Sequence, residues 1–445
     1  MTVLMKNTKR KVILCWVKDK VNKMKQLTLF KSSLIALALA SSSASFAQSF
    51  AITHATVHTV TEQGVLENAT VVVENGKVIA INPETINADS IIDAKGKILT
   101  PGLIGSMNQL GLVEVSAVSL SRDASDKKAN ITFDASLAFN PRSTVVPYSR
   151  KGGITSNVVA PRGGDDMFKG QTFVADLSGE FDSVRTNNNS VVIDLGAESK
   201  GSRALSLQNL QFKFEDAVKE LAKVNKKTKN AKDEKEAKEL KEPSREVQII
   251  NALLAGEKAL IAYADRATDL LVLLKMKEQF SLNLVLVGAA DAVLIADKIA
   301  DAKVTVVMTA LDNLPGSFDA LHASLENAAK LTQAGVSVAL TVNGDTHNLY
   351  QLRFHVGNAI ANGLSRDAAL ASVTANVAKA FNLDSGTIAV GKTADLVLWS
   401  ADPFELSTKV SQMWIDGKEY STQSRQDALR DRYTTPSDMP KAYIK

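Results

Sequence analysis

Cysteine is almost absent from this 445-residue sequence, and the single one, Cys15, lies in the leader described below. A mature chain without a thiol excludes disulfide bonds, so the core alone must stabilise the fold. Aromatic residues are also scarce, at 5% of the chain against 45% hydrophobic residues. A core of Ala, Val, Leu and Ile is typical of an α/β protein with a buried parallel sheet.

Beyond residue 47, no apolar run is long enough to span a membrane. Residues 24–47 have the three parts of a secretory signal peptide: a basic start at Met24, an apolar run over 33–40, and small residues before a cleavage site after Ala47. We therefore expect an exported, periplasmic, soluble protein, and the lack of a cysteine at this cleavage site argues against a lipid anchor. Residues 1–23 precede the signal, so Met24 is the expected start, with Met1 as the alternative.

An excess of positive charge is also missing once this leader is removed. Residues 1–47 carry nine Lys or Arg and one Asp, a net charge of +8, so the formal net charge changes from +4 to −4. A basic surface for nucleic acid is therefore not supported. Within the mature chain, residues 214–246 are rich in Lys and Glu. This insertion either binds an acidic partner or is a solvated helical or partly disordered excursion, as is usual for runs of mixed charge.

Two β-rich ends flank a middle in which strands and helices alternate. Residues 48–100 and 385–445 contain short strands with the turn signals Asn75-Gly76 and Asp416-Gly417, and residues 101–384 alternate apolar strands with helical patterns. The apolar runs of the middle, after a first strand within the stretch 99–111, cover 153–160, 190–195, 259–264, 282–287, 303–308 and 335–341. We predict an α/β fold: a (β/α)8 barrel of TIM type, with its site at the carboxyl ends of the strands, and a small β-sandwich built from both chain ends.

Several motifs occur in an order that is more specific than any one of them. They are Thr100–Ile104, Gly152–Thr155, the Pro-Arg-Gly-Gly loop at 161–164, Thr374–Phe381 and Gly386–Trp399. Together they resemble the metal-dependent amidohydrolase superfamily over most of the mature chain, in particular its exported, imidazolonepropionase-like branch. The resemblance implies a barrel with a composite β-sandwich, and hydrolysis of C–N bonds by a water that a metal ion activates.

The metal ligands that this resemblance implies are replaced. The superfamily's His-x-His pair falls on Met107 and Gln109, whose spacing on a strand predicts side chains on one face. Tyr263 occupies a strand on which the family offers a histidine, and Asn343 the place of its aspartate, unless a shift of register makes Asp345 the equivalent. Asp176 falls near the position of a metal-bridging lysine. A thioether and neutral amides are poor zinc ligands, so we predict a degenerate metal site and assign no cofactor.

Three polar residues near the expected mouth of the barrel are candidates for function. Asp345 and His347 follow the last barrel strand and form either an acid–base pair or a polar loop that caps the next helix. Arg162 either binds a substrate carboxylate or belongs to an ordinary glycine-rich loop. The other histidines are predicted to be structural: His54 and His58 in the strands of the β-sandwich and His322 on a helix, all remote from the mouth, and His355 inside a helix.

Two hypotheses about function remain. The first is a hydrolase of C–N bonds in non-peptide or cyclic amides, working with an eroded metal site. The alternative is a non-catalytic pseudoenzyme that binds a small molecule or serves as the partner of a metal-competent relative. Both predict a small-molecule ligand, no nucleic acid and no membrane anchor, and both allow a homo-oligomer or a pair with a related subunit. Fold by itself does not decide between them.

Overall fold

The structure is a computed structural model, and it describes residues 49–196, 201–230 and 243–435. The predicted signal peptide, Cys15 and residues 231–242 of the charged insertion lie outside the described residues. Within the described ranges, no helix combines the length and the apolar character that crossing a membrane requires.

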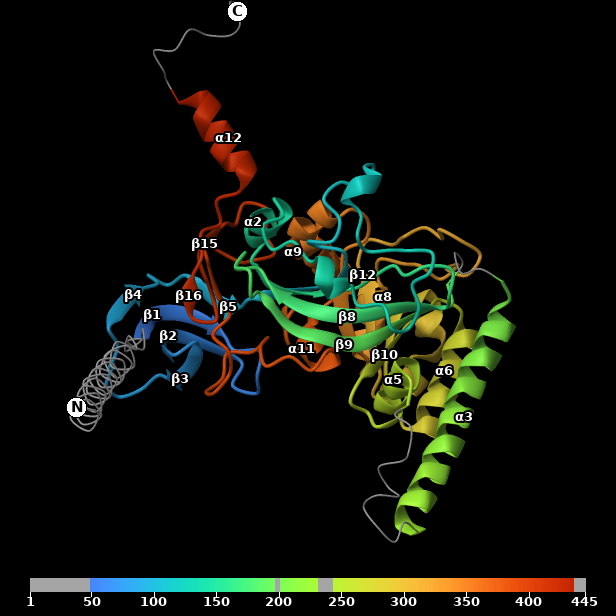
Figure 1. The fold of residues 1–445 in the computed structure, drawn as a ribbon. Helices are drawn as coiled ribbons and strands as arrows, with labels where there is room; N and C mark the ends of the chain where they lie inside the picture. Colours follow the sequence, from blue (N-terminus) through green and yellow to red (C-terminus); the bar gives the residue numbers. More distant parts are fainter. Residues whose placement is uncertain (1–48, 197–200, 231–242, 436–445) are drawn as a thin grey trace, which may run out of the picture. The chain divides into compact units, whose positions relative to one another are not determined.

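One eight-stranded sheet contains strands from both ends of the chain (Figure 1). Its strand order is β16-β15-β14-β5-β1-β2-β3, with β4 also pairing with β1. The turn pairs Asn75-Gly76 and Asp416-Gly417 both have positive φ, at 50° and 74° and at 52° and 71°. Such left-handed pairs match the twist of a tight hairpin, so both predicted turns are confirmed. The strands are β1 (Ser49–His58), β2 (Val65–Glu74), β3 (Lys77–Ile81), β4 (Ser90–Asp93), β5 (Ile98–Pro101), β14 (Leu396–Trp399), β15 (Val410–Ile415) and β16 (Lys418–Glu419).

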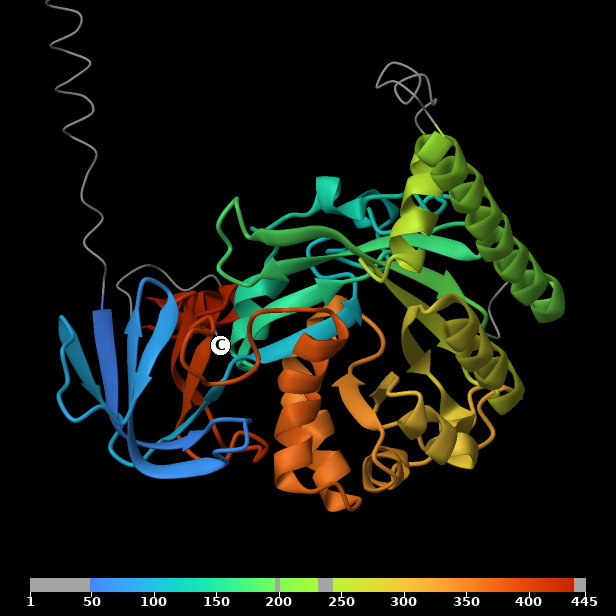
Figure 2. The same cartoon turned by 90° about the horizontal axis from the view of Figure 1, so that it is seen from below.

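The second sheet, the barrel sheet, also has eight strands and is nearly closed. They run in the order β13-β12-β11-β10-β9-β8-β7-β6, and the Oγ1 of Thr341 on β13 donates to the carbonyl of Ser106 on β6 at 2.5 Å, across the closure. The helices that follow β9 to β12 lie outside this sheet (Figure 2). Its strands are β6 (Leu103–Asn108), β7 (Ile154–Val159), β8 (Phe168–Asp176), β9 (Val184–Asp194), β10 (Ala259–Ala264), β11 (Asn283–Gly288), β12 (Thr305–Thr309) and β13 (Ser337–Thr341).

Strand β8 departs from the predicted repeat of eight β/α units. It was not among the predicted apolar runs, and it pairs antiparallel with both β7 and β9, whereas the other neighbouring pairs of this sheet are parallel. The reason is the length of the connections: residues 160–167 and 177–183 are too few for the helical crossover that a parallel return requires. The mixed α/β fold with a barrel-like sheet is confirmed, and β8 is its exception.

Apolar side chains fill the inside of the barrel sheet. On β10, Ile261 packs in a buried cluster with Val192, Val285 and Val307, while Leu260 packs in a different cluster on the outer face. This alternation is expected of strands that are buried on both faces. Helix α11 (Ala375–Ala380) closes the amino-terminal end, where the side-chain amide of Asn376 donates to the carbonyl of Val338 at 2.7 Å.

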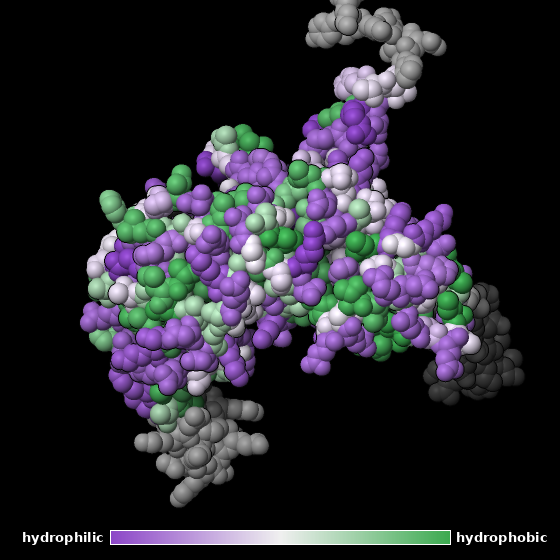
Figure 3. Space-filling view, turned by 180° about the vertical axis from the view of Figure 1, so that it is seen from behind, coloured by the Kyte–Doolittle hydropathy of each residue, from purple (hydrophilic) through white to green (hydrophobic). Residues whose placement is uncertain are grey.

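Helices and short turns complete the chain. The long α3 (Arg203–Asn230) buries a stripe that includes Leu210 and Phe214. The last helix, α12 (Arg425–Thr434), buries none of its side chains and presents a mostly hydrophilic surface (Figure 3). The others are α2 (Val145–Arg150), α5 (Arg245–Leu254), α6 (Ala267–Phe280), α7 (Ala296–Asp301), α8 (Asn327–Gln333), α9 (Leu352–Ala361) and α10 (Arg366–Ser372), with 3-10 turns η1 (Ser119–Ser121), η2 (Ala135–Ala138), η3 (Ala290–Ile295) and η4 (Thr346–Gln351).

Candidate functional site

The carboxyl ends of the parallel strands form the mouth of the barrel, and the segment after β6 crosses it. On one side the backbone N–H of Arg162 donates to the carbonyl of Ala124 at 2.8 Å. On the other, the Oγ1 of Thr346 donates to the carbonyl of Val113 at 3.2 Å. The β6 loop, residues 109–144, therefore contacts both the loop after β7 and the loop after β13.

Met107 and Gln109 lie at this end of β6. Met107 is 7% exposed and packs in the apolar cluster inside the barrel. Its φ of 58° is left-handed, and the pairing of β6 with β7 shifts register between Ser106 and Asn108. The regular alternation that predicted one shared face for Met107 and Gln109 is therefore interrupted at Met107 itself.

Tyr263 is the polar side chain on the inner face of β10. It is paired in register with Asp194, the last residue of β9, and its carbonyl accepts from the N–H of Leu195 at 2.8 Å. Burial raises the pKa of the Tyr263 phenol above its ordinary value; the charge of Asp194 raises it further, and Arg162 opposes the shift. The phenol is a neutral hydrogen-bonding group at physiological pH, with an acid and an arginine within electrostatic reach. Arg162, Asp194 and Tyr263 are called the mouth triad below.

The loop after β13 holds Asn343, Asp345 and His347, all three exposed. Asp345 is the N-cap residue of η4, but its carboxylate accepts a hydrogen bond from the Oγ of Ser116 rather than capping the helix. Among the described side chains, Asp345 and His347 are not hydrogen-bonded to each other. The structure thus places this pair at the mouth beside the β6 loop, without assembling the acid–base contact that general catalysis requires.

Asp176 does not lie at the mouth, and this part of the site prediction is wrong. It is the last residue of β8, which runs antiparallel, and it pairs with Ser156 near the start of β7. The carboxyl end of β8 therefore lies at the amino-terminal end of the parallel strands. There the carboxylate of Asp176 accepts from the Nε of Arg185 at 2.6 Å, as part of a structural ion cluster.

Sequence reasoning missed Asp194 and misplaced His322. Asp194 lies near the end of the apolar run 190–195, which was recognised as a strand, and a carboxylate at that position is the signal that would have found it. His322 precedes α8 instead of lying on a helix, and its Nδ1 lies 2.7 Å from the carboxylate of Asp291, which follows β11. It therefore sits on the mouth side of the sheet. His355 and Arg353 lie in α9, where both side chains are buried, and they do not belong to the loop after β13.

The donor atoms at the four aligned ligand positions do not fit zinc. They are a buried thioether, two neutral amides and a phenol whose raised pKa favours the protonated form. Zinc sites use imidazole, carboxylate or thiolate. Among the described residues, no group of three or more His, Cys, Asp or Glu side chains is placed to hold a metal ion. A pocket of about 500 Å³ lies elsewhere, between α3 and the loop before β8, and none of the predicted site residues lines it.

Comparisons with known proteins agree with this architecture. The sequence profile of the amidohydrolase family matches residues 240–420. An amidohydrolase from Thermotoga maritima superposes with a TM-score of 0.75 at 25% identity, covering 84% of this chain and 99% of that one. The resemblance to the amidohydrolase superfamily is confirmed.

Other relatives of this amidohydrolase-like chain give narrower support. Imidazolonepropionase from Aromatoleum aromaticum is 43% identical over 100 residues, which is 21% of this chain and 24% of that protein. The chain thus matches about a quarter of this curated relative. A prolidase solved with N-methylphosphonate-L-proline covers 84% of this chain at a TM-score of 0.51 and 15% identity, which shows the fold alone.

Proposed function

We propose that this amidohydrolase-like protein binds a small carboxylate-bearing molecule at the mouth of its barrel and does not use zinc to hydrolyse it. The observation that carries the proposal is the mouth triad: a neutral Tyr263 is paired in register with Asp194 and lies within electrostatic reach of Arg162, at a position where the resemblance to the family implies a metal ligand. A guanidinium pairs with a carboxylate through two parallel hydrogen bonds, and a neutral phenol donates a further one.

The donor set makes the same point from the chemical side. A zinc ion lowers the pKa of a bound water only when it is held by good ligands. The side chain of Met107 packs in an apolar cluster, and the raised pKa of Tyr263 favours its protonated, neutral form. No step of hydrolysis is therefore assigned to a metal at these positions, and the mouth is proposed to serve recognition.

Hydrolysis of a C–N bond by a rebuilt site is the second candidate, favoured by the similarity to imidazolonepropionase. It assigns acid–base roles to Asp345 and His347. Purified residues 48–445 separate the two candidates by metal analysis and by a turnover screen with dipeptides and cyclic amides, with and without added Zn²⁺ or Mn²⁺. We expect no stoichiometric metal and no turnover. Stoichiometric zinc that Asp345→Ala abolishes, or chelator-insensitive turnover lost in His347→Ala, would establish the hydrolase instead.

Replacing Arg162 is expected to weaken ligand binding. N-acyl amino acids and cyclic amides bearing a carboxylate serve as the probe panel, with binding measured by calorimetry. Loss of a charge-assisted contact costs about 1.5–3 kcal/mol, so Arg162→Ala should weaken the best binder by roughly 10- to 100-fold. Arg142→Ala is the matched control, because Arg142 is an exposed arginine whose ion-pair partner, Glu180, lies in the connection between β8 and β9. Equal affinities for both variants would contradict the role of Arg162.

Export, periplasmic location and pairing with a second copy or a related subunit stay predictions. The loops around the mouth expose large apolar side chains, including Leu120 at 96% and Phe318 at 92%. Light scattering of the purified chain measures its oligomeric state directly.

A further inference from the structure

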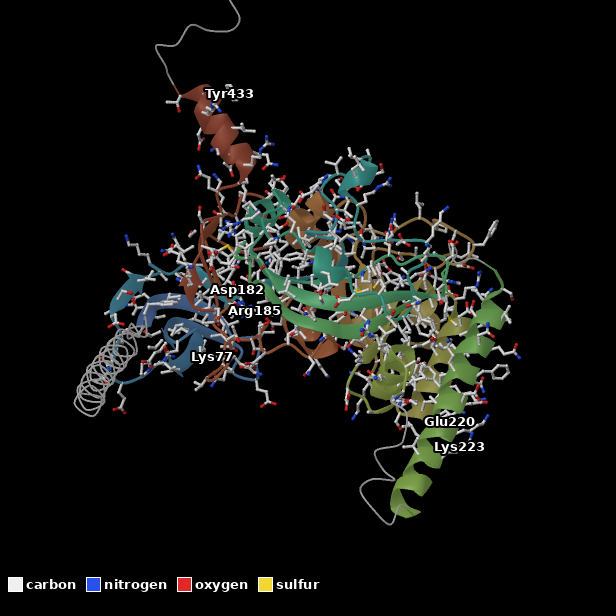
Figure 4. All side chains as sticks on the ribbon, in the orientation of Figure 1. Lys77, Asp182, Arg185, Glu220, Lys223 and Tyr433 are labelled. Atoms are coloured by element: carbon white, nitrogen blue, oxygen red, sulfur yellow. The ribbon has the colours of Figure 1, made fainter. Side chains whose placement is uncertain are left out.

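Three carboxylates and one arginine meet where the barrel sheet contacts the C-terminal strands. Arg185 on β9 binds Asp176 of β8 through its Nε at 2.6 Å and approaches the carboxylate of Asp416 at 3.8 Å through its Nη1. Asp416 lies in the turn between β15 and β16, and its backbone N–H donates to the carboxylate of Asp395 at 2.8 Å. Figure 4 labels Arg185 and its neighbour Asp182 on the β8–β9 side of this contact.

The cluster is short of positive charge. Asp176 and Asp395 are each 6% exposed, whereas the side chains of Arg185 and Asp416 are 34% and 55% exposed. With every group ionised, three negative charges face one guanidinium in a partly desolvated place. Like charges that share a buried site favour the uptake of a proton by one of them.

Asp395 is the member most disposed to take that proton. Burial raises its pKa to about 6; the N–H of Asp416 and the charge of Arg185 lower it, and the charges of Asp176 and Asp416 raise it again. The carbonyl of Asp395 also accepts from the N–H of Gly102 at 2.8 Å, at the point where the chain passes from β5 into β6. Asp395 therefore contacts the C-terminal turn and the entry to the barrel together.

We propose that the Arg185 cluster is an acid-stabilised junction: uptake of a proton by Asp395 tightens the contact of the β15–β16 turn with the barrel, and loss of that proton as the pH rises to neutral loosens the contact. The proton goes onto a carboxylate oxygen of Asp395, which removes one of the three negative charges. The charge of Arg185 then faces two carboxylates, Asp176 and Asp416, instead of three. The repulsion between Asp395 and Asp416 in the turn is removed.

The direction of the pH dependence follows from linkage. A carboxyl whose folded pKa is raised binds more protons folded than unfolded between the two values. Its contribution to stability is therefore present at low pH and is lost as pH rises from about 4 to about 6. The pKa shift of Asp384, and therefore its effect on the pH dependence of stability, has the opposite sign. Hydrogen bonds from Lys77 at 2.7 Å and Lys392 at 2.9 Å lower the pKa of Asp384.

The test compares unfolding midpoints of the wild type, Asp395→Asn and Asp384→Asn from about pH 4 to about pH 8. Asp395→Asn cannot ionise, so above pH 6.5 it should melt about 2–4 °C higher than the wild type, with the difference disappearing near pH 4. Asp384→Asn, the control, should melt lower than the wild type at neutral pH and match it at acid pH. A pH-independent difference for Asp395→Asn would overturn the proposal.

Hydrogen exchange locates the effect. Amides of the β15–β16 turn in the wild type should exchange several-fold faster at pH 7.5 than at pH 5 after correction for intrinsic rates, and this change should vanish in Asp395→Asn. Amides of β12 serve as the internal reference, because β10 and β11 separate that strand from β9, which carries Arg185. A pH response of equal size in β12 and in the turn would mean global loosening and would contradict a local junction.

Discussion

Arg353→Met should lower the free energy of unfolding by about 3–5 kcal/mol, because it leaves three carbonyl groups without their donor. Arg353 is 3% exposed, and its guanidinium donates to the carbonyls of Pro403, Glu405 and Thr408, each at 2.8 Å. These acceptors belong to the connection between β14 and β15, so one side chain of α9 holds a loop of the C-terminal strands. Chemical denaturation of the two proteins measures the loss.

Arg366→Met is the matched control for this variant. Arg366 contacts the same connection through Asp402 and Glu405, but its side chain is 56% exposed. Exposed ion pairs contribute about 1 kcal/mol or less, so this substitution should be nearly neutral. Equal losses for Arg353→Met and Arg366→Met would show that burial of the guanidinium is not what stabilises the loop.

Local chemistry explains which parts of the fold were predictable. Asn-Gly and Asp-Gly pairs adopt left-handed φ at little cost, so the hairpins at Asn75-Gly76 and Asp416-Gly417 were predictable from four residues. The only indication that β5 pairs with β14 was that both chain ends contain short strands separated by turn signals. No periodicity encodes the contact of Thr100 with Val397, which the structure shows.

Strand direction explains the largest error at the site. The resemblance placed Asp176 near a metal-bridging position, at the end of the barrel where the parallel strands have their carboxyl ends. Because β8 runs antiparallel, its carboxyl end lies at the opposite end of the sheet, and Asp194 on β9 occupies the mouth instead. Direction depends on the length of the connections on each side of a strand, so a strand-by-strand interpretation of the sequence could not assign it.

The same limit applies to the charged groups of the mouth. Arg162 and Tyr263 are 101 positions apart in the sequence, and the influence of the Arg162 charge on the Tyr263 phenol depends on how the loop after β7 is held against the β6 loop. Motif order predicted that Arg162 and Tyr263 lie near the mouth. The third member, Asp194, could be identified only from the register in which β9 pairs with β10. The candidate site is therefore a product of strand pairing more than of any short motif.

Gly153→Ala should cost about 3 kcal/mol of stability, through backbone strain and overlap with a buried ring. Gly153 belongs to the motif before β7 and has a φ of +80°, and an added Cβ would overlap Cζ2 and Cη2 of Trp399. Trp399 is fully buried and donates from Nε1 to the Oγ1 of Thr100 at 2.9 Å, so the ring has no free direction in which to move. Thermal and chemical unfolding measure the effect.

Shortening the ring should restore part of this loss. Trp399→Phe removes the atoms that the new Cβ overlaps, so the double variant Gly153→Ala/Trp399→Phe should be more stable than the sum of the single effects by about 1–2 kcal/mol. Gly391→Ala is the control for strain alone, because Gly391 has a φ of +87° and nothing within 4 Å of an added Cβ. It should cost about 1 kcal/mol, with no coupling to Trp399→Phe. Additive effects for Gly153→Ala and Trp399→Phe would mean that the close approach of this glycine to Trp399 does not limit the packing of the C-terminal strands on the barrel.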